Sequence, residues 1–253
     1  MKKTLIIIPT YNEKENIEAI IRAIFSLARP FDVLIVDDGS PDGTASIVQS
    51  LQAEFPDRLF LERRKGKLGL GTAYIHGFKY ALRRDYVYVG EMDADFSHNP
   101  VDLLRLYEVC EEGYDMAIGS RYINGITVVN WPMDRLLMSY FGSRYVRTIT
   151  GMPINDTTAG FILYHREALE AINFDEIKFT GYGFQIQMKF YAWKLGFRLK
   201  EVPIIFTDRT KGTSKMTSGI FKEAVFGVVK MKVQSWFKRF IPSHRAVPSS
   251  ELN

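Results

Sequence analysis

Short apolar runs alternate with helical patterns through the first half of the chain. The runs have the length and composition of strands buried on both faces of a sheet, and they cover residues 5–8, 33–36, 59–61, 86–89 and 116–118. Between them, apolar residues recur every three or four positions, as Ile17, Ile20 and Ile24 do, which indicates helices that pack by one face. This alternation predicts an α/β fold in which helices flank a mostly parallel sheet.

The second half has longer and less regular elements. We expect helices over 132–150, 184–195 and 220–240, a strand over 161–164 and an extended segment over 199–206. The expected apolar contacts of the 132–150 helix are Leu136, Leu137, Tyr140 and Val146. No repeat or linker divides the chain, so we expect one domain over residues 1–240, with a C-terminal amphipathic helix, and a flexible tail over 241–253.

Composition narrows the class of protein only slightly. The formal net charge of +4 fits an anionic ligand or an anionic membrane, and it equally fits a merely basic surface. Cys110 is the one cysteine, which excludes an intramolecular disulfide. Pro9 ends the first apolar run too early for a signal peptide, and no apolar run approaches the ~18 residues of a membrane span. We therefore expect a soluble, cytoplasmic protein.

Polar, turn-forming loops follow four of the predicted strands, at residues 9–13, 37–44, 67–71 and 91–95. Each loop alone has a structural explanation, since Asp-Gly pairs are common turns and Asp42 is a plausible helix N-cap. Ligands of open α/β sheets bind beyond the carboxyl ends of the strands, where all four loops meet. Together they predict a polar rim that holds a nucleotide.

The strongest single signal is the pair Asp93 and Asp95, which follows the predicted strand 86–89. In an extended segment, side chains two residues apart project to the same side, so the two carboxylates repel each other unless a cation lies between them. Oxygen ligands favour Mg²⁺ or Mn²⁺, which also bind substrate phosphates. The alternative is a solvated acidic turn.

These residues carry a family resemblance. In order from about residue 4 to 233, the chain resembles the dolichol-phosphate mannose synthases of glycosyltransferase family 2. The matching motifs lie at residues 9–13, 36–44, 69–73, 93–100, 119–122, 156–161, 182–185 and 208–215. The segments 93–100 and 208–215 are the most specific, because a short acidic motif alone occurs in many transferases.

The resemblance implies a GT-A (Rossmann-like) fold and a Mg²⁺- or Mn²⁺-dependent enzyme. The implied reaction is inverting transfer of mannose from GDP-mannose to dolichyl or undecaprenyl phosphate, which makes the chain a polyprenyl-phosphate mannosyltransferase. An ionised phosphate oxygen is the nucleophile, so no strong general base is required. Another donor, such as UDP-glucose or UDP-GlcNAc, is an alternative, because the rim residues do not specify guanine.

The resemblance also implies roles for individual residues. The nucleotide-sugar site comprises Pro9, Tyr11, Glu13, Asp38, Asp93, Ala94, Asp95, Gln187, Arg209 and Lys215, with the metal on Asp93 and Asp95. The lipid phosphate is expected at Arg121, Arg135 and Ser139, although Arg135 can also be read as a solvated helix residue. The catalytic set is Asp95, Asp156, Arg209 and Lys215.

Two positions depart from the family pattern. Ser97 stands where some relatives have a metal-contacting glutamine, and Gln187 stands where the family usually has a glutamate. The Gln187 exchange removes a negative charge, through natural variation or engineering. It leaves open a second hypothesis: a catalytically impaired protein that binds a nucleotide sugar.

The acceptor lipid requires a membrane surface. Segments 131–149 and 220–240 combine aromatic and basic residues, as helices that lie in a membrane interface do. We expect peripheral association with the cytoplasmic face of a membrane, and ordinary packing against the sheet is the alternative. A membrane-anchoring partner protein is also compatible with the sequence, and nucleic acid is not an expected partner.

Overall fold

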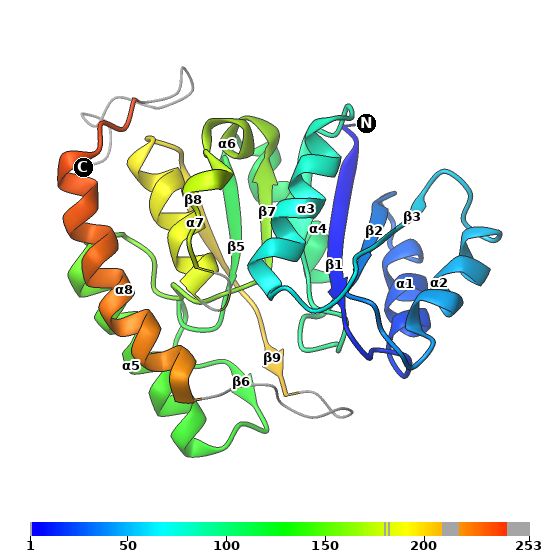
Figure 1. Cartoon of the computed structure of the whole chain (residues 1–253), viewed down its shortest axis with the longest axis horizontal. Helices are drawn as coiled ribbons and strands as arrows, with labels where there is room; N and C mark the ends of the chain where they lie inside the picture. Colours follow the sequence, from blue (N-terminus) through cyan, green and yellow to red (C-terminus); the bar gives the residue numbers. More distant parts are fainter. Residues whose placement is uncertain (1, 180, 182, 209–217, 242–253) are drawn as a thin grey trace.

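A computed structural model describes residues 2–179, 181, 183–208 and 218–241, and in the last helix it describes side chains from Phe226 onward. Within these residues a single mixed sheet organises the chain (Figure 1). The predicted α/β class and single domain are confirmed.

The central sheet has the strand order β3-β2-β1-β4-β7-β5-β8. Its strands are β1 (Thr4–Thr10), β2 (Asp32–Asp37), β3 (Leu59–Arg63), β4 (Tyr88–Glu91), β5 (Met116–Ser120), β7 (Ile162–His165) and β8 (Leu199–Pro203). Only β7 runs antiparallel to its neighbours, β4 and β5. The carboxyl ends of β1, β2, β3 and β4 therefore lie at one edge, as the sequence predicts.

Helices cover both faces of the sheet and enclose two apolar cores. One core includes the buried side chains of α1 (Ile17–Phe25), α2 (Thr44–Gln52) and α4 (Asp102–Glu111). The other includes those of α3 (Leu70–Leu82), α6 (Arg166–Ala171) and α7 (Gly183–Lys194). The apolar stripe expected on the first helix is confirmed, because Ile17, Ile20, Ile21 and Ile24 are the buried residues of α1. Helix α3 approaches β1 closely at Gly77, where a Cβ atom would lie 2.7 Å from Ile7.

The second half adds a region beside β5 and β8. Helices α5 (Met133–Thr150) and α8 (Ser218–Phe237) pack against each other at one end of the molecule (Figure 1). Next to them, the short strands β6 (Val128–Val129) and β9 (Phe206–Thr207) form a separate parallel pair. This pair connects the segment before α5 to the segment after β8.

Several expectations need correction. The fourth strand is displaced to Tyr88–Glu91, because Gly90 and Glu91 pair with Leu163 and Ile162 of β7. Leu137 is not a packing contact of α5, since it is 46% exposed. Helix α6, strand β6 and the short 3-10 helix η1 (Phe174–Glu176) were not predicted. Most of the expected tail, residues 242–253, lies outside the described residues, and within the described part no helix has the length and apolar character to cross a membrane.

Candidate functional site

The loop after β2 is organised by the buried carboxylate of Asp37. Asp37 accepts hydrogen bonds from the hydroxyls of Thr10 (3.0 Å) and Ser40 (2.5 Å) and from the backbone N–H groups of Gly39 and Ser40. These bonds join the ends of β1 and β2. Asp37 is therefore a structural part of the rim, whereas the nucleotide was expected at its neighbour Asp38.

Asp38 forms a two-point ion pair with Arg64, at 2.6 and 2.8 Å, and both side chains are largely buried. A third guanidinium nitrogen of Arg64 donates to Thr72 at 2.8 Å. Sequence reasoning missed Arg64, although its position directly after β3 was a usable signal. The pair places a carboxylate and a guanidinium side by side at the predicted nucleotide rim.

The predicted residues of the first loop lie at the same edge. Pro9 is in β1 opposite Val36 of β2, and Tyr11 and Glu13 are half-buried. The backbone N–H of Glu13 donates to the hydroxyl of Thr44 at 3.0 Å, which holds the loop against the start of α2. The Lys67 ammonium lies 5.4 Å from the centre of the Tyr11 ring. The structure thus brings the first three loops together.

The acidic segment after β4 is a bent loop rather than an extended strand. Phe96 has a positive φ of 60°, and the backbone N–H of Ser97 donates to Asp95 at 3.1 Å. The alternation of side chains along an extended strand, which the sequence predicts for Asp93 and Asp95, is therefore not present here. The loop is instead held by His98, whose Nδ1 accepts from the backbone N–H of Asp93 at 3.3 Å.

His98 is fixed in its neutral form. Its ring is buried and stacks on Phe161 with the centroids 4.8 Å apart. Burial, reinforced by the Arg121 charge, lowers the pKa of His98 to about 4, although Asp95 and Asp156 oppose the change. A neutral imidazole leaves Nδ1 able to accept the hydrogen bond from Asp93. His98 lies in the motif at residues 93–100, but the sequence alone assigns this histidine no role.

The residues of this loop fit a divalent cation. Within the described residues, no cluster of three or more His, Cys, Asp or Glu side chains is arranged around a metal position. The hydroxyl of Ser97 is buried beside Asp95 and has no hydrogen-bond partner in the described part of the chain. Two carboxylates and one hydroxyl are hard oxygen ligands, and substrate phosphates complete such a shell for Mg²⁺ or Mn²⁺.

A buried polar network lies beneath the acidic loop. Glu91 accepts hydrogen bonds from Tyr164 (3.1 Å) and Gln185 (2.5 Å), and burial raises the pKa of Glu91 to about 8. Lys189 is also fully buried and donates to three carbonyl oxygens, those of Thr157, Ala159 and Gln185. Burial lowers the pKa of Lys189 to about 8, against the attraction of Asp156 and Glu91. Sequence reasoning did not find this network, although a glutamate at the end of an apolar strand was a signal.

The predicted acceptor residues Arg121 and Asp156 form one unit. Asp156 has no exposed surface and accepts two bonds of 2.6 Å from the Arg121 guanidinium and one of 2.9 Å from its backbone N–H. Burial opposes ionisation, but the Arg121 charge and hydrogen bonds outweigh it and lower the pKa of Asp156. Arg121 also donates to Thr158 at 2.9 Å. Asp156 therefore stays ionised and holds Arg121 in place.

The other two acceptor candidates lie on α5. Arg135 forms a 2.8 Å ion pair with Asp208, which follows β9, and lies 4.2 Å from the ring of Trp131. Ser139 accepts a 2.7 Å hydrogen bond from the hydroxyl of Tyr122. The interactions of Arg121 with Tyr122 and Trp131 join these residues to the Asp156 unit.

Of the three remaining predicted nucleotide-sugar residues, the structure describes one, Gln187. Gln187 does not contact the rim: its side-chain oxygen accepts from the backbone N–H of Lys178 (2.9 Å), and its nitrogen donates to the carbonyl of Glu176 (2.9 Å). Arg209 and Lys215 lie outside the described residues.

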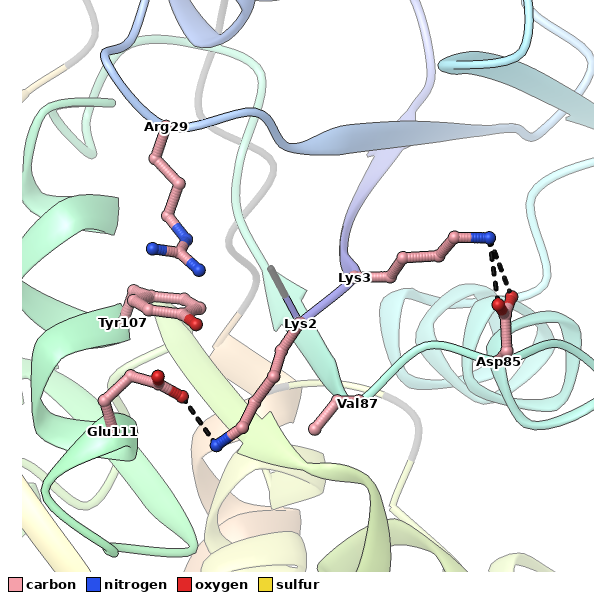
Figure 2. A pocket seen from close by; sticks show the side chains of 7 residues that line it. All are labelled: Lys2, Lys3, Arg29, Asp85, Val87, Tyr107 and Glu111. Atoms are coloured by element: carbon pink, nitrogen blue, oxygen red, sulfur yellow. Dashed lines mark hydrogen bonds and ion pairs between the residues drawn. The ribbon is translucent and has the colours of Figure 1, made fainter.

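A separate hollow lies at the opposite edge of the sheet, by the amino ends of β1 and β4 (Figure 2). It has a volume of about 660 Å³ and is lined by Lys2, Lys3, Arg29, Asp85, Val87, Tyr107 and Glu111. Its lysines are paired with acids, Lys2 with Glu111 at 2.8 Å and Lys3 with Asp85 at 2.9 Å. None of the predicted site residues lines this hollow, and the candidate site is the opposite rim.

The chain is similar to known proteins over most of its length. Residues 5–172 match the family described as "Glycosyl transferase family 2". A polyprenol monophosphomannose synthase of Mycolicibacterium smegmatis is 44% identical over 238 residues, which cover 94% of this chain and 90% of that protein. An undecaprenyl-phosphate mannosyltransferase of Micrococcus luteus is 45% identical over 228 residues, which cover 90% of this chain and 93% of that protein.

Among solved structures, the chain resembles glucosyl-3-phosphoglycerate synthase from Mycobacterium tuberculosis. In the complex of that protein with Mn²⁺, uridine diphosphate and glucosyl-3-phosphoglycerate, the TM-score is 0.66 at 15% identity, over 96% of this chain and 82% of that one. The complex with Mn²⁺, UDP-glucose and phosphoglyceric acid gives a TM-score of 0.67 at 14% identity, over 96% and 82% of the two chains. At this identity the likeness concerns the fold alone.

Proposed function

Because the chain belongs to glycosyltransferase family 2, we propose that it is a polyprenyl-phosphate mannosyltransferase, which transfers mannose from a nucleotide sugar to polyprenyl phosphate. The observation that carries the proposal is the similarity, at 44% and 45% identity over nearly the whole chain, to two proteins named for this reaction. The polar rim, the acidic loop after β4 and the buried pair of Arg121 and Asp156 support the proposal.

GDP-mannose is the proposed donor. The rim offers the adjacent carboxylate of Asp38 and guanidinium of Arg64, which suit the hydrogen-bonding edge of a base. Tyr11 and Glu13 belong to the loop after β1, which contacts Lys67 and Thr44 of the neighbouring loops. A uracil base has a comparable edge, so UDP-glucose and UDP-GlcNAc remain the alternatives that the donor assay separates.

Asp93, Asp95 and Ser97 are the proposed holders of Mg²⁺ or Mn²⁺. A cation held by these residues would neutralise charge on the leaving diphosphate. Two solved structures of the Mycobacterium tuberculosis synthase, which shares the fold, are described with Mn²⁺ and a uridine nucleotide, which supports this choice of cation class. Arg209 and Lys215 are proposed to assist at the diphosphate, on the resemblance alone.

The proposed chemistry is a single displacement at the anomeric carbon. An oxygen of the lipid phosphate attacks, its new bond to the sugar forms as the bond to the diphosphate breaks, and the configuration inverts. A phosphate monoester is ionised at neutral pH, so no side chain has to remove a proton. Asp156 is accordingly proposed to position Arg121 toward the acceptor, since it is already bound to that guanidinium. Positioning and charge compensation then account for the rate.

Helices α5 and α8 are the proposed contact with an anionic membrane surface. They pack side by side (Figure 1). Both carry large apolar side chains that are more than one-third exposed. These are Met133, Leu137, Met138 and Phe141 on α5, and Phe226, Val229, Val233, Trp236 and Phe237 on α8. Exposed apolar groups next to the basic residues Lys230 and Arg239 are typical of interfacial helices. A membrane-anchoring partner protein that covers this face is the competing proposal, and binding of the isolated protein to vesicles distinguishes the two.

The test is transfer of labelled mannose from GDP-mannose to undecaprenyl phosphate in detergent, with Mg²⁺ or Mn²⁺ and an EDTA control. We expect the label to enter the organic phase and EDTA to abolish the transfer. Transfer from UDP-glucose or UDP-GlcNAc instead would replace the donor assignment. Binding of GDP-mannose without transfer to any polyprenyl phosphate would contradict the mannosyltransferase proposal.

A further inference from the structure

Trp131 lies beside both arginines that the sequence assigns to the acceptor phosphate. The guanidinium carbon of Arg121 is 5.3 Å from the centre of the Trp131 ring, and that of Arg135 is 4.2 Å away. Phe206 of β9 packs edge-on against the same ring, with the centroids 5.3 Å apart. The indole therefore has positive charge near it from two different elements.

The indole N–H of Trp131 is shielded from solvent, and it has no hydrogen-bond partner within the described part of the chain. A buried donor without an acceptor destabilises the folded state, because its hydrogen bond to water is lost and no other hydrogen bond replaces it. Buried indole N–H groups normally find a partner. An exception beside two guanidinium groups indicates a position prepared for an incoming oxygen that carries negative charge.

The order of strands places this position on the acceptor side of the site. The nucleotide rim lies at the ends of β1, β2 and β3, and the acidic loop follows β4 in the middle of the sheet. Arg121 follows β5, on the far side of β4 from the rim, and Trp131 packs on Arg121 and on β9. An anion bound here is therefore separated from the base and ribose by the acidic loop.

We propose that Trp131 Nε1 donates a hydrogen bond to an oxygen of the acceptor's phosphate, as a third donor beside Arg121 and Arg135. This inference rests on the proposed function, because it takes polyprenyl phosphate as the acceptor. Trp131 contributes selectivity for phosphate over the free alcohol, because its hydrogen bond to a charged phosphate oxygen is stronger than one to a neutral hydroxyl.

Direct binding tests the inference without requiring turnover. Farnesyl phosphate is titrated by calorimetry into the wild-type protein and into Trp131→Phe, which keeps an aromatic ring for the arginines but loses the N–H together with the five-membered ring that carries it. We expect the Kd of the variant to rise about tenfold or more, the effect of losing a hydrogen bond to a charged group. Trp193→Phe, on α7 and packed against Phe190, is the matched control and keeps the wild-type Kd. Farnesol, which has a neutral hydroxyl in place of the phosphate, is expected to show a smaller difference in Kd between wild type and Trp131→Phe.

Activity measurements add a second readout. In Trp131→Phe the KM for polyprenyl phosphate rises by a similar factor, whereas the KM for GDP-mannose stays unchanged. A change confined to the donor KM would overturn the inference and place the N–H at the nucleotide sugar. The inference would also be overturned if Trp131→Phe kept the wild-type Tm and bound farnesyl phosphate with the wild-type Kd. If Trp131→Phe bound farnesyl phosphate more weakly but the wild type transferred no mannose, the proposed reaction would be refuted. The phosphate site at Trp131 would still be supported.

Discussion

The guanidinium of Arg121 and the carboxylate of Asp156 meet through two hydrogen bonds of 2.6 Å, and both side chains are buried. The two residues come from different strand ends, after β5 and before β7. A carboxylate engaged in this way is a poor proton acceptor, which agrees with a reaction in which the nucleophile is already ionised. The pair is best understood as a positioned cation with a fixed counter-charge.

Asp156→Asn is expected to destabilise the protein by about 3–5 kcal/mol, because it leaves the Arg121 charge buried without a counter-ion. Urea denaturation measures the change. Glu112→Gln is the control: it removes an exposed ion pair to Lys200 and should change stability by less than about 1 kcal/mol. Equal stability of Asp156→Asn and wild type would show that the pair does not support the fold.

Gln187→Glu is expected to lower stability by about 1–3 kcal/mol and not to raise activity. The Gln187 side chain donates to the Glu176 carbonyl as well as accepting from Lys178, and an ionised carboxylate cannot donate. The exposed residue Gln49 provides the control Gln49→Glu. A several-fold gain in mannosyl transfer by Gln187→Glu would instead favour the hypothesis of an impaired enzyme.

Loss of Asp95 or Ser97 is expected to weaken binding of Mn²⁺ in the presence of GDP. Asp95→Asn removes a charged ligand, and Ser97→Ala removes a hydroxyl that is buried without a partner in the described part of the chain. We expect roughly tenfold to hundredfold weaker binding for Asp95→Asn and a smaller loss for Ser97→Ala, by calorimetry. Asp85→Asn, at the opposite edge, should bind Mn²⁺ as the wild type does. Unchanged affinity in Asp95→Asn would place the cation elsewhere.

Glu91 is expected to make the protein less stable as the pH rises. Its pKa is about 8 in the folded state, against 4.5 ordinarily, because burial disfavours the charged form. The folded state therefore holds a proton that the unfolded chain has released, so this stabilisation is complete below pH 4.5 and is lost as the pH rises toward 8. Urea denaturation between pH 5 and 8.5 should show the decline in wild type and a smaller decline in Glu91→Gln. An identical pH dependence in the two proteins would contradict the prediction.

Apolar residues of α5 and α8 are expected to hold the protein on anionic vesicles. Leu137→Asp and Trp236→Asp each replace an exposed apolar group with a charge that the lipid surface repels. In a vesicle sedimentation assay, each variant should bind roughly tenfold more weakly than wild type. Val101→Asp, which alters an exposed residue outside both helices, is the control. Equal vesicle binding by wild type and all three variants would place the membrane contact outside these helices, and no vesicle binding by the isolated wild type would favour a protein partner on this face.

The sequence by itself determined the local elements and the edge of the sheet at which the polar loops gather. The spacing of Ile17, Ile20, Ile21 and Ile24 is visible without any knowledge of their neighbours, because an amphipathic helix buries every third or fourth residue. The polar loops after β1, β2, β3 and β4 were likewise readable, since parallel strands place their carboxyl ends at one edge.

Only the tertiary structure decided how the polar residues pair within that edge. Asp38 with Arg64, Arg121 with Asp156 and Glu91 with Gln185 join positions 26, 35 and 94 residues apart. The role of Gln187 was also unreadable, since the same amide suits a substrate site or a turn of the backbone. Hydrophobic periodicity is a local property of the chain, whereas the partner of a buried charge depends on which distant segments the packed core brings within hydrogen-bonding distance.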